Sequence, residues 1–164
     1  MTLKQDLQLL TFAGVTAGAG ISANVAGQRW LAWPAVVCVD LYLLAVLVLA
    51  ARRADDKDFR RRNTWVIGWF PRRTAGMAVV LLLLTASVTG FAGLYVGTDV
   101  FSPHKDPLDA LYLSVLILGF SDFGPNEGYG QFVVITQLVS AIVLLMGVFP
   151  ILISRLSSFD SPDT

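Results

Sequence analysis

The sequence predicts an all-α membrane protein with four transmembrane helices and one short re-entrant helix followed by a loop. The 164 residues are 55% hydrophobic and have a mean hydropathy of +0.65, values typical of membrane proteins. Four apolar stretches reach the length of about 20 residues needed to cross a bilayer, whereas a fifth stops at about ten. Eight of the twelve Lys and Arg residues fall in one segment, 52–73, which predicts the orientation of the spans.

The first span is expected at residues 7–27. It carries small side chains at helical spacing, which allow another helix to approach closely. These residues are Gly14, Gly18, Ala19 and Ala23. A pair such as Gly14 and Gly18 serves either as a dimerisation face or as a packing face inside one subunit.

The second span, 30–51, is apolar apart from Asp40. An ionised aspartate at the centre of a lipid-facing helix costs about 3 kcal/mol, so we expect this side chain to face protein or water. Asn24 and Arg29 are its expected partners. Two interpretations stay open: an ion or proton site, and a buried polar contact.

The basic segment 52–73 predicts topology. By the positive-inside rule it is cytoplasmic, which places both termini in the cytoplasm and makes the chain a multi-pass protein of the plasma (inner) membrane. Trp65, Trp69 and Phe70 follow the arginines at helical spacing. The segment is therefore expected either to lie along the membrane surface or to be a basic loop that only sets topology. The formal net charge of zero argues against nucleic acid as a partner.

The third span is expected at residues 74–97. At about 1.5 Å per residue it reaches about 36 Å, enough to cross a bilayer with some tilt. Small residues three and four positions apart predict a packing face on it. They are Ala86, Gly90, Gly93 and Gly97.

The last span, 131–156, is a long helix with two candidate bending positions, Gly147 and Pro150. One of its faces carries polar and small residues together with one isoleucine, repeated at the helical period. The residues of this stripe are Thr136, Ser140, Gly147 and Ile151. The stripe either packs against protein or, if several copies surround a pore, lines it, with Ile151 as a hydrophobic constriction.

Residues 106–131 interrupt the series of spans. The apolar segment that begins at Pro107 is too short to cross and therefore predicts a re-entrant helix. Turn-forming residues crowd the positions after it: Gly119, Ser121, Gly124, Pro125, Gly128 and Gly130. Irregular backbone at membrane depth is tolerated only where protein buries it or where it lines a water-filled cavity.

Two stretches of this loop resemble the pore of tetrameric potassium-type cation channels. Residues 109–115, DALYLSV, are similar to the start of a bacterial pore helix, for which Asp106 is a suitable cap and Pro107 fits the first turn. Residues 122–131, DFGPNEGYGQ, are similar to the stretch after the selectivity filter. The resemblance covers 74–156 and implies an outer helix, a pore helix, a filter loop and an inner helix in each subunit of a tetrameric pore.

Between the two stretches the sequence is a few residues shorter than the family pattern, so two registers compete. In the preferred register the family's Thr-Val-Gly-Tyr-Gly is replaced by Ile117, Leu118, Gly119, Phe120 and Ser121, with Asp122 as the acid that follows. In the other, the pore helix is intact and the filter is Phe120, Ser121, Asp122, Phe123 and Gly124. In the preferred register Ile117 supplies no ring of hydroxyls and Ser121 disfavours a positive backbone angle, so weak potassium selectivity is expected.

The resemblance implies a homotetramer in the lipid bilayer that conducts potassium or other monovalent cations passively. The ions are expected at the filter positions Ile117, Leu118, Gly119 and Phe120. Rings of acidic side chains are expected to favour cations: Asp99, Asp106, Asp109, Asp122 and Glu127. Gly147 and Pro150 are the expected gating hinge.

The chain is expected to divide into an accessory part, 1–73, a pore domain, 74–156, and a flexible cytoplasmic tail, 157–164. No cofactor is expected beyond the permeant ions, and no set of nucleophile, base and orienting residues indicates an enzyme. The alternative function is a non-conducting channel-like membrane scaffold or partner subunit that has the same architecture.

Overall fold

A computed structural model describes residues 2–53, 55–63, 66, 73–103, 105–119, 124–148 and 150. Its elements are α1 (Thr2–Ala26), α2 (Arg29–Arg53), α3 (Lys57–Arg62), α4 (Arg73–Gly97), α5 (Pro107–Leu118), α6 (Tyr129–Ile142) and a π-helix that continues α6, η1 (Val143–Val148). The described residues form helices and no strands. Four segments are long and apolar enough to span a membrane: Leu7–Ala26, Arg29–Arg53, Gly76–Gly97 and Tyr129–Gly147. The predicted all-α class with four membrane helices is confirmed.

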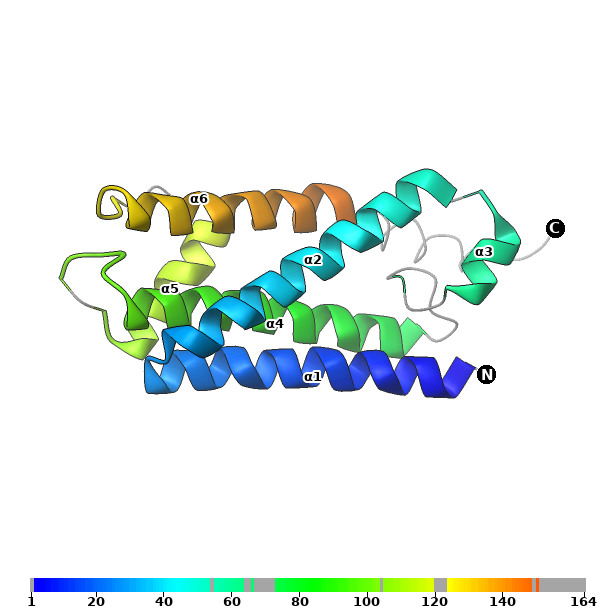
Figure 1. The fold of residues 1–164 in the computed structure, drawn as a ribbon, viewed down its shortest axis with the longest axis horizontal. Coiled ribbons are helices and arrows are strands. Elements are labelled where there is room, and N and C mark those ends of the chain that lie inside the picture. The colour runs from blue at the N-terminus through cyan, green and yellow to red at the C-terminus, as the bar shows by residue number, and fades with distance from the viewer. Residues whose placement is uncertain are drawn as a thin grey trace.

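Helix α4 is the centre of the helix bundle. It lies alongside α1, contacts α2 and α5 over shorter lengths and touches α6. In Figure 1, α2 crosses the bundle obliquely, α6 lies on the side opposite to α1, and the short α5 slants between α4 and α6. Every other described span is therefore positioned by its contact with α4 or with a helix that α4 holds.

Small residues let the neighbouring helices approach α4 closely. A Cβ atom added at Gly90 would lie 2.9 Å from Val36 Cγ2 on α2, and one added at Gly93 would lie 2.8 Å from Ala23 Cβ on α1. A Cβ at Gly97 would lie 2.8 Å from the carbonyl oxygen of Gly27, in the turn between α1 and α2. The packing face predicted for the third span is confirmed.

The expected small-residue face of α1 is only partly correct. A Cβ at Gly14 or Gly18 would meet no atom within 4 Å, so neither glycine makes a close helix contact inside the subunit. The buried face of α1 instead follows the helical period through Ala13, Ala17, Gly20 and Ala23. At Gly20 an added Cβ would lie 3.0 Å from the Ala86 carbonyl oxygen. The face of α1 that packs on α4 is thus shifted by about one residue from the predicted face, and the Gly14 and Gly18 pair points away from α4.

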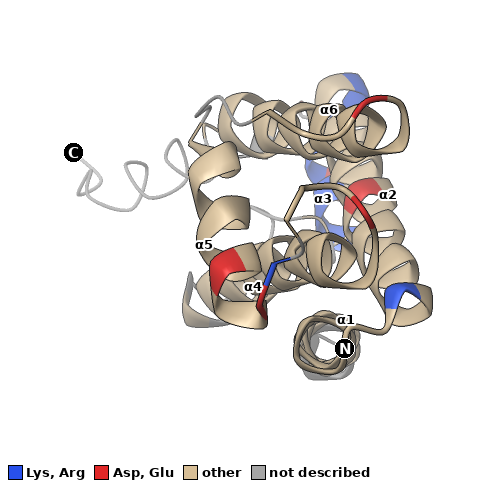
Figure 2. Ribbon diagram, turned by 90° about the vertical axis from the view of Figure 1, so that its left-hand side faces the viewer, with Lys and Arg blue, Asp and Glu red and all other residues tan. Residues whose placement is uncertain are grey.

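The two ends of the helix bundle differ in charge. Figure 2 looks along the helices from the end that holds the α4–α5 and α5–α6 connections, where acidic segments are drawn red. We call this the acidic end; it carries the exposed residues Asp99, Asp106, Asp109 and Glu127. The opposite end, which we call the basic end, carries the start of α1, the C-terminal end of α2, and α3 (Figure 1).

Helix α3 begins at a side-chain cap and is held to the bundle by one aromatic ring. Asp56 Oδ1 accepts hydrogen bonds from the backbone N–H groups of Asp58 (3.0 Å) and Phe59 (2.9 Å). Phe59 packs against the apolar cluster at the basic end, and the Arg53 guanidinium lies 4.6 Å from the centre of its ring. Trp65, Trp69 and Phe70, which are expected at the membrane surface, lie outside the described residues.

Candidate functional site

The candidate site is built around α5, which has the position and length of a re-entrant helix. Pro107 occupies the first turn, and the backbone carbonyl of Asp106 accepts a hydrogen bond from Ala110 N–H at 2.8 Å, although the Asp106 side chain makes no cap bond. Its 12 residues extend about 18 Å, well short of the about 30 Å of a hydrocarbon core. The helix starts at the acidic end, and its C-terminus lies part-way along the bundle, near α6 (Figure 1), with α5 on one outer side of the bundle (Figure 2).

A buried polar network fastens α5 to the two helices on either side of it. Gln137 Nε2 on α6 donates to the Ser114 carbonyl oxygen (2.7 Å) and to Ser114 Oγ (3.0 Å) on α5. Ser114 Oγ in turn donates to the Val88 carbonyl oxygen on α4 at 2.8 Å, and the Tyr95 hydroxyl on α4 donates to Gln137 Oε1. Ser114 and Gln137 are 0% exposed and Tyr95 is 1% exposed. Each hydrogen bond contributes about 1 kcal/mol, and loss of a partner here would cost more because water does not reach these groups.

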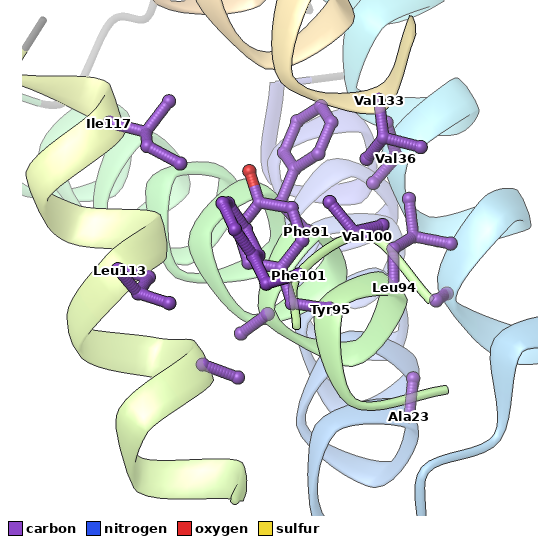
Figure 3. Packing of buried hydrophobic residues seen from close by; sticks show 13 residues of the cluster. Ala23, Val36, Phe91, Leu94, Tyr95, Val100, Phe101, Leu113, Ile117 and Val133 are labelled. Carbon is purple, nitrogen blue, oxygen red and sulfur yellow. The ribbon is translucent and has the colours of Figure 1, made fainter. Parts of the chain in front are cut away.

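The network is embedded in an apolar cluster at the acidic end. Figure 3 shows Leu113 and Ile117 of α5 directed toward Phe91, Tyr95 and Phe101. The rings of Tyr95 and Phe101 meet edge to face, with centroids 5.0 Å apart and planes at 82°. Such pairs add about 1 kcal/mol beyond the burial of their area. The hydrogen bonds therefore set the position of α5, and the surrounding apolar side chains exclude water from those bonds.

The positions predicted for the filter divide between α5 and residues outside the described ranges. Ile117 and Leu118 form the last turn of α5, and Ile117 is fully buried. Gly119 is the C-cap of the helix, and its N–H donates to the carbonyl oxygens of Leu116 (3.0 Å) and Val115 (3.2 Å). Phe120, Ser121 and Asp122 lie outside the described residues.

This placement differs from the preferred register at two positions. A filter strand needs an extended backbone whose carbonyls point toward the ion path. Ile117 and Leu118 have a helical backbone instead, because the apolar run of α5 continues through them and buries the Ile117 side chain. The register in which the pore helix is intact agrees with the observed helix.

Asn126, a residue that sequence reasoning did not single out, joins the segment before α6 to the segment after α4. Its Nδ2 donates to the Asp99 carbonyl oxygen (2.8 Å) and to Ser102 Oγ (3.1 Å), and its backbone N–H donates to the Val100 carbonyl oxygen (2.7 Å). Gly130 lies so close that an added Cβ would be 2.8 Å from the Val100 carbonyl oxygen. The segment entering α6 is thus tied to the segment leaving α4.

The stripe predicted to line a pore has two different surroundings. Ser140 is buried and Gly147 lies against α2, where an added Cβ would be 2.9 Å from Leu47 Cδ1. Thr136 is half-buried and donates to the Phe132 carbonyl oxygen of its own helix at 2.8 Å. Pro150 is exposed, and Ile151 lies outside the described residues. In this conformation α2 covers Ser140 and Gly147.

The exposed face of α6 and η1 is apolar instead. It carries Phe132, Ile135, Val139, Ile142 and Met146. Ser140 and Gly147 face the bundle because α2 supplies a polar partner for the first and close packing for the second. The helical period alone does not show which side of α6 meets a neighbouring helix.

Asp40 meets a partner different from those expected. The side chain that approaches its carboxylate is the Ser140 hydroxyl of α6. Arg29 begins α2 about 16 Å away along the helix axis, and Asn24 lies beside Gly93 of α4, with its backbone nitrogen 3.0 Å from a Cβ placed there. Both expected partners therefore sit near the α1–α2 turn, a level of the bundle that Asp40 does not reach.

The chain was compared with family models, with curated proteins and with solved structures, and no match was found in any of the three. The residues of α5 and its network therefore carry the functional inference.

Proposed function

We propose that four copies of this chain form a passive monovalent cation channel with weak ion selectivity. The observation that carries the proposal is α5, a helix too short to cross, which three buried side chains from three helices hold part-way into the bundle. A scaffold made only of spanning helices has no need of such an element. Backbone that turns back at membrane depth is expected to face water or protein, and a four-fold arrangement supplies both.

The direction of α5 supports cations as the permeant species. The C-terminal end of a helix carries a partial negative charge of about half a unit, because its last carbonyls are unpaired. In α5 this end lies part-way along the bundle (Figure 1), while the acidic residues Asp106 and Asp109 lie at the start of the helix, at the acidic end. In a tetramer four such ends converge near the axis and stabilise a cation there.

The helical state of Ile117 and Leu118 supports the second register, with a filter from Phe120 to Gly124. In that register Asp122 supplies a ring of four carboxylates within the filter. Rings of acidic side chains favour cations but discriminate among them less than rings of backbone carbonyls. The proposed channel therefore accepts potassium and other monovalent cations.

The proposal is tested by rubidium uptake into liposomes that contain the purified full-length protein, with its tetrameric state measured separately by crosslinking. We expect uptake down a rubidium gradient, with chloride much less permeant. An intact tetramer that passes no cation under any gradient would refute the channel and leave the alternative, a non-conducting channel-like scaffold or partner subunit.

Asp122→Asn is expected to lower the ratio of cation to anion permeability in either register, because Asp122 supplies an acidic ring in both. The two registers are separated by a second variant. Ile117→Thr is expected to destabilise the protein without sharpening selectivity, because it places a hydroxyl in the apolar cluster. Sharper potassium selectivity in the double variant Ile117→Thr and Ser121→Gly would instead restore the first register.

A further inference from the structure

Three residues on one face of α2 contact α6 or η1: Trp33, Asp40 and Leu47, which we call the seam. They are spaced seven apart, and residues seven apart lie two turns from one another and share a helix face. The contacts they make on α6 and η1 progress in the same direction, from Tyr129 to Ser140 to Gly147. The two helices therefore run in the same sense, but α2 crosses obliquely and comes closest to the other helix at η1 (Figure 1).

The contacts of the seam change in kind along its length. Trp33 Nε1 donates to the Tyr129 hydroxyl at 3.1 Å, and the Trp33 ring lies 6.2 Å from the ring of Phe132. At Asp40 the approaching side chain is the Ser140 hydroxyl, and Oδ1 is buried with no hydrogen-bond partner among the described residues. Leu47 lies against Gly147, where the two helices come closest. Long side chains therefore bridge the helices at the acidic end, and close apolar contact joins them at η1.

The contacts of Asp40 and Leu47 bracket the irregular part of the inner helix. The π-helix η1 begins three residues after Ser140 and contains Gly147. Single π turns are rare, widen the helix and commonly mark places where it bends. Leu144, inside η1, is buried in the same apolar cluster as Val39, Tyr42 and Val46 of α2. The part of the inner helix that departs from α-helical geometry is thus the part that α2 holds.

Ser140 has two competing acceptors at the edge of η1. Its hydroxyl donates to the Thr136 carbonyl oxygen at 2.9 Å. A serine hydroxyl has one proton, so it cannot serve Thr136 and the unpaired oxygen of Asp40 at the same time. Rotation toward Asp40 removes the hydroxyl from the Thr136 carbonyl oxygen, which keeps its backbone partner within α6. The hydroxyl therefore has two alternative acceptors at the edge of η1.

We propose that the seam sets the conformation of the inner helix: α2, through Asp40 and Leu47, selects between arrangements of η1. This is the conformational part of the proposal. The gating part rests on the proposed cation channel: there, α2 controls how readily the basic end of the pore opens. Asp40 and Leu47 are positioning residues and need not touch the ion.

The conformational part is tested without any ion flux, by hydrogen–deuterium exchange of the amides at 143–148 in the full-length protein in lipid nanodiscs. Leu47→Ala is expected to raise their exchange rate about ten-fold, because it removes the contact that covers η1. The matched control is Leu44→Ala, at a position on α2 that is 51% exposed and outside the seam. Equal exchange in the two variants would overturn the proposal.

Two further variants keep the test decisive if Leu47→Ala folds poorly. Gly147→Ala adds a methyl group on the opposite side of the same contact, so combining it with Leu47→Ala is expected to return exchange to within about two-fold of the unmodified protein. Purely additive effects would contradict a direct contact. Asp40→Asn competes less for the Ser140 proton and is expected to lower exchange at 143–148 about three-fold, and unchanged exchange would remove Asp40 from the mechanism.

The gating part is tested by rubidium uptake with the same variants. Uptake is expected to change at least about three-fold in Leu47→Ala and to stay unchanged in Leu44→Ala. If the unmodified protein conducts and its exchange at 143–148 responds to Leu47→Ala while uptake does not, the gating part is refuted. If the unmodified protein does not conduct, the proposed channel and the gating part fall together, and the exchange result still decides the conformational part.

Discussion

The helix formed by α6 and η1 is held in contrasting ways at its two halves. Toward the acidic end, Gln137 joins it to α5 and α4 through a network of fully buried groups. Toward the basic end, it is an irregular helix that α2 contacts at Gly147 and near a carboxylate oxygen of Asp40 that has no hydrogen-bond partner among the described residues. A polar network in which every group has a partner specifies one geometry, whereas a contact with an unused acceptor permits two. The chain therefore combines a rigid support for α5 with an adjustable basic end.

The largest effect is expected from Gln137→Leu, which removes the side chain at the centre of the network. It leaves the buried Tyr95 hydroxyl without its acceptor and takes the Gln137 donor away from Ser114, at a cost of about 1 to 3 kcal/mol for each buried group that loses its partner. We expect the free energy of unfolding, measured by denaturant titration in detergent, to fall by about 3 kcal/mol.

Thr136→Ala is the matched control for that variant. Thr136 precedes Gln137 on the same helix, but its hydroxyl bonds only to the backbone of its own helix, at Phe132. Its replacement is expected to change the free energy of unfolding by less than about 0.5 kcal/mol. Similar losses in the two variants would mean that the network does not distinguish the acidic end from the rest of the helix.

An intermediate effect is expected from paired glycine substitutions. In Gly93→Ala the new methyl would lie 2.8 Å from Ala23 Cβ and 3.0 Å from the α1 backbone, so overpacking of about 1 to 3 kcal/mol outweighs the helix-propensity gain of about 1 kcal/mol. Gly18→Ala meets nothing within 4 Å and keeps the gain. Thermal unfolding should therefore shift downward for the first variant and upward for the second.

The same pair also tests the dimerisation interpretation of the first span. If Gly18→Ala weakens the tetramer while leaving the subunit folded, the Gly14 and Gly18 face contacts another copy. Crosslinking yields and thermal unfolding, measured on the same samples, separate these two results. A downward shift for both variants with unchanged crosslinking would contradict the packing found for α1.

The smallest effect is expected from Asp56→Ala, at the start of α3 on the basic end. The variant removes the cap bonds to the N–H groups of Asp58 and Phe59, worth about 1 kcal/mol of local helix stability. Exchange of these two amides is expected to rise about five-fold, with Asp55→Ala as the control. An equal rise in the control would show that charge, rather than the cap, holds α3.

Most of the architecture could be predicted without the structure. The four spans follow from the lengths of the apolar runs, and α5 follows from a proline-started run too short to cross. The structure extends α5 to 12 residues, through Leu118, because Ile117 finds a buried place beside Phe91 and Tyr95. That extension changes which residues are available to form a filter.

Sequence alone determined properties that one segment carries by itself: its length, its apolarity, its charge and the spacing of its small residues. Only the tertiary structure decided the partners. Gln137 meets Ser114 across 23 positions and Tyr95 across 42, and Asp40 meets Ser140 rather than Asn24 or Arg29. The physical reason is that helical periodicity defines which residues share a face, while the rotation and depth of each helix, set by packing around α4, define what that face meets.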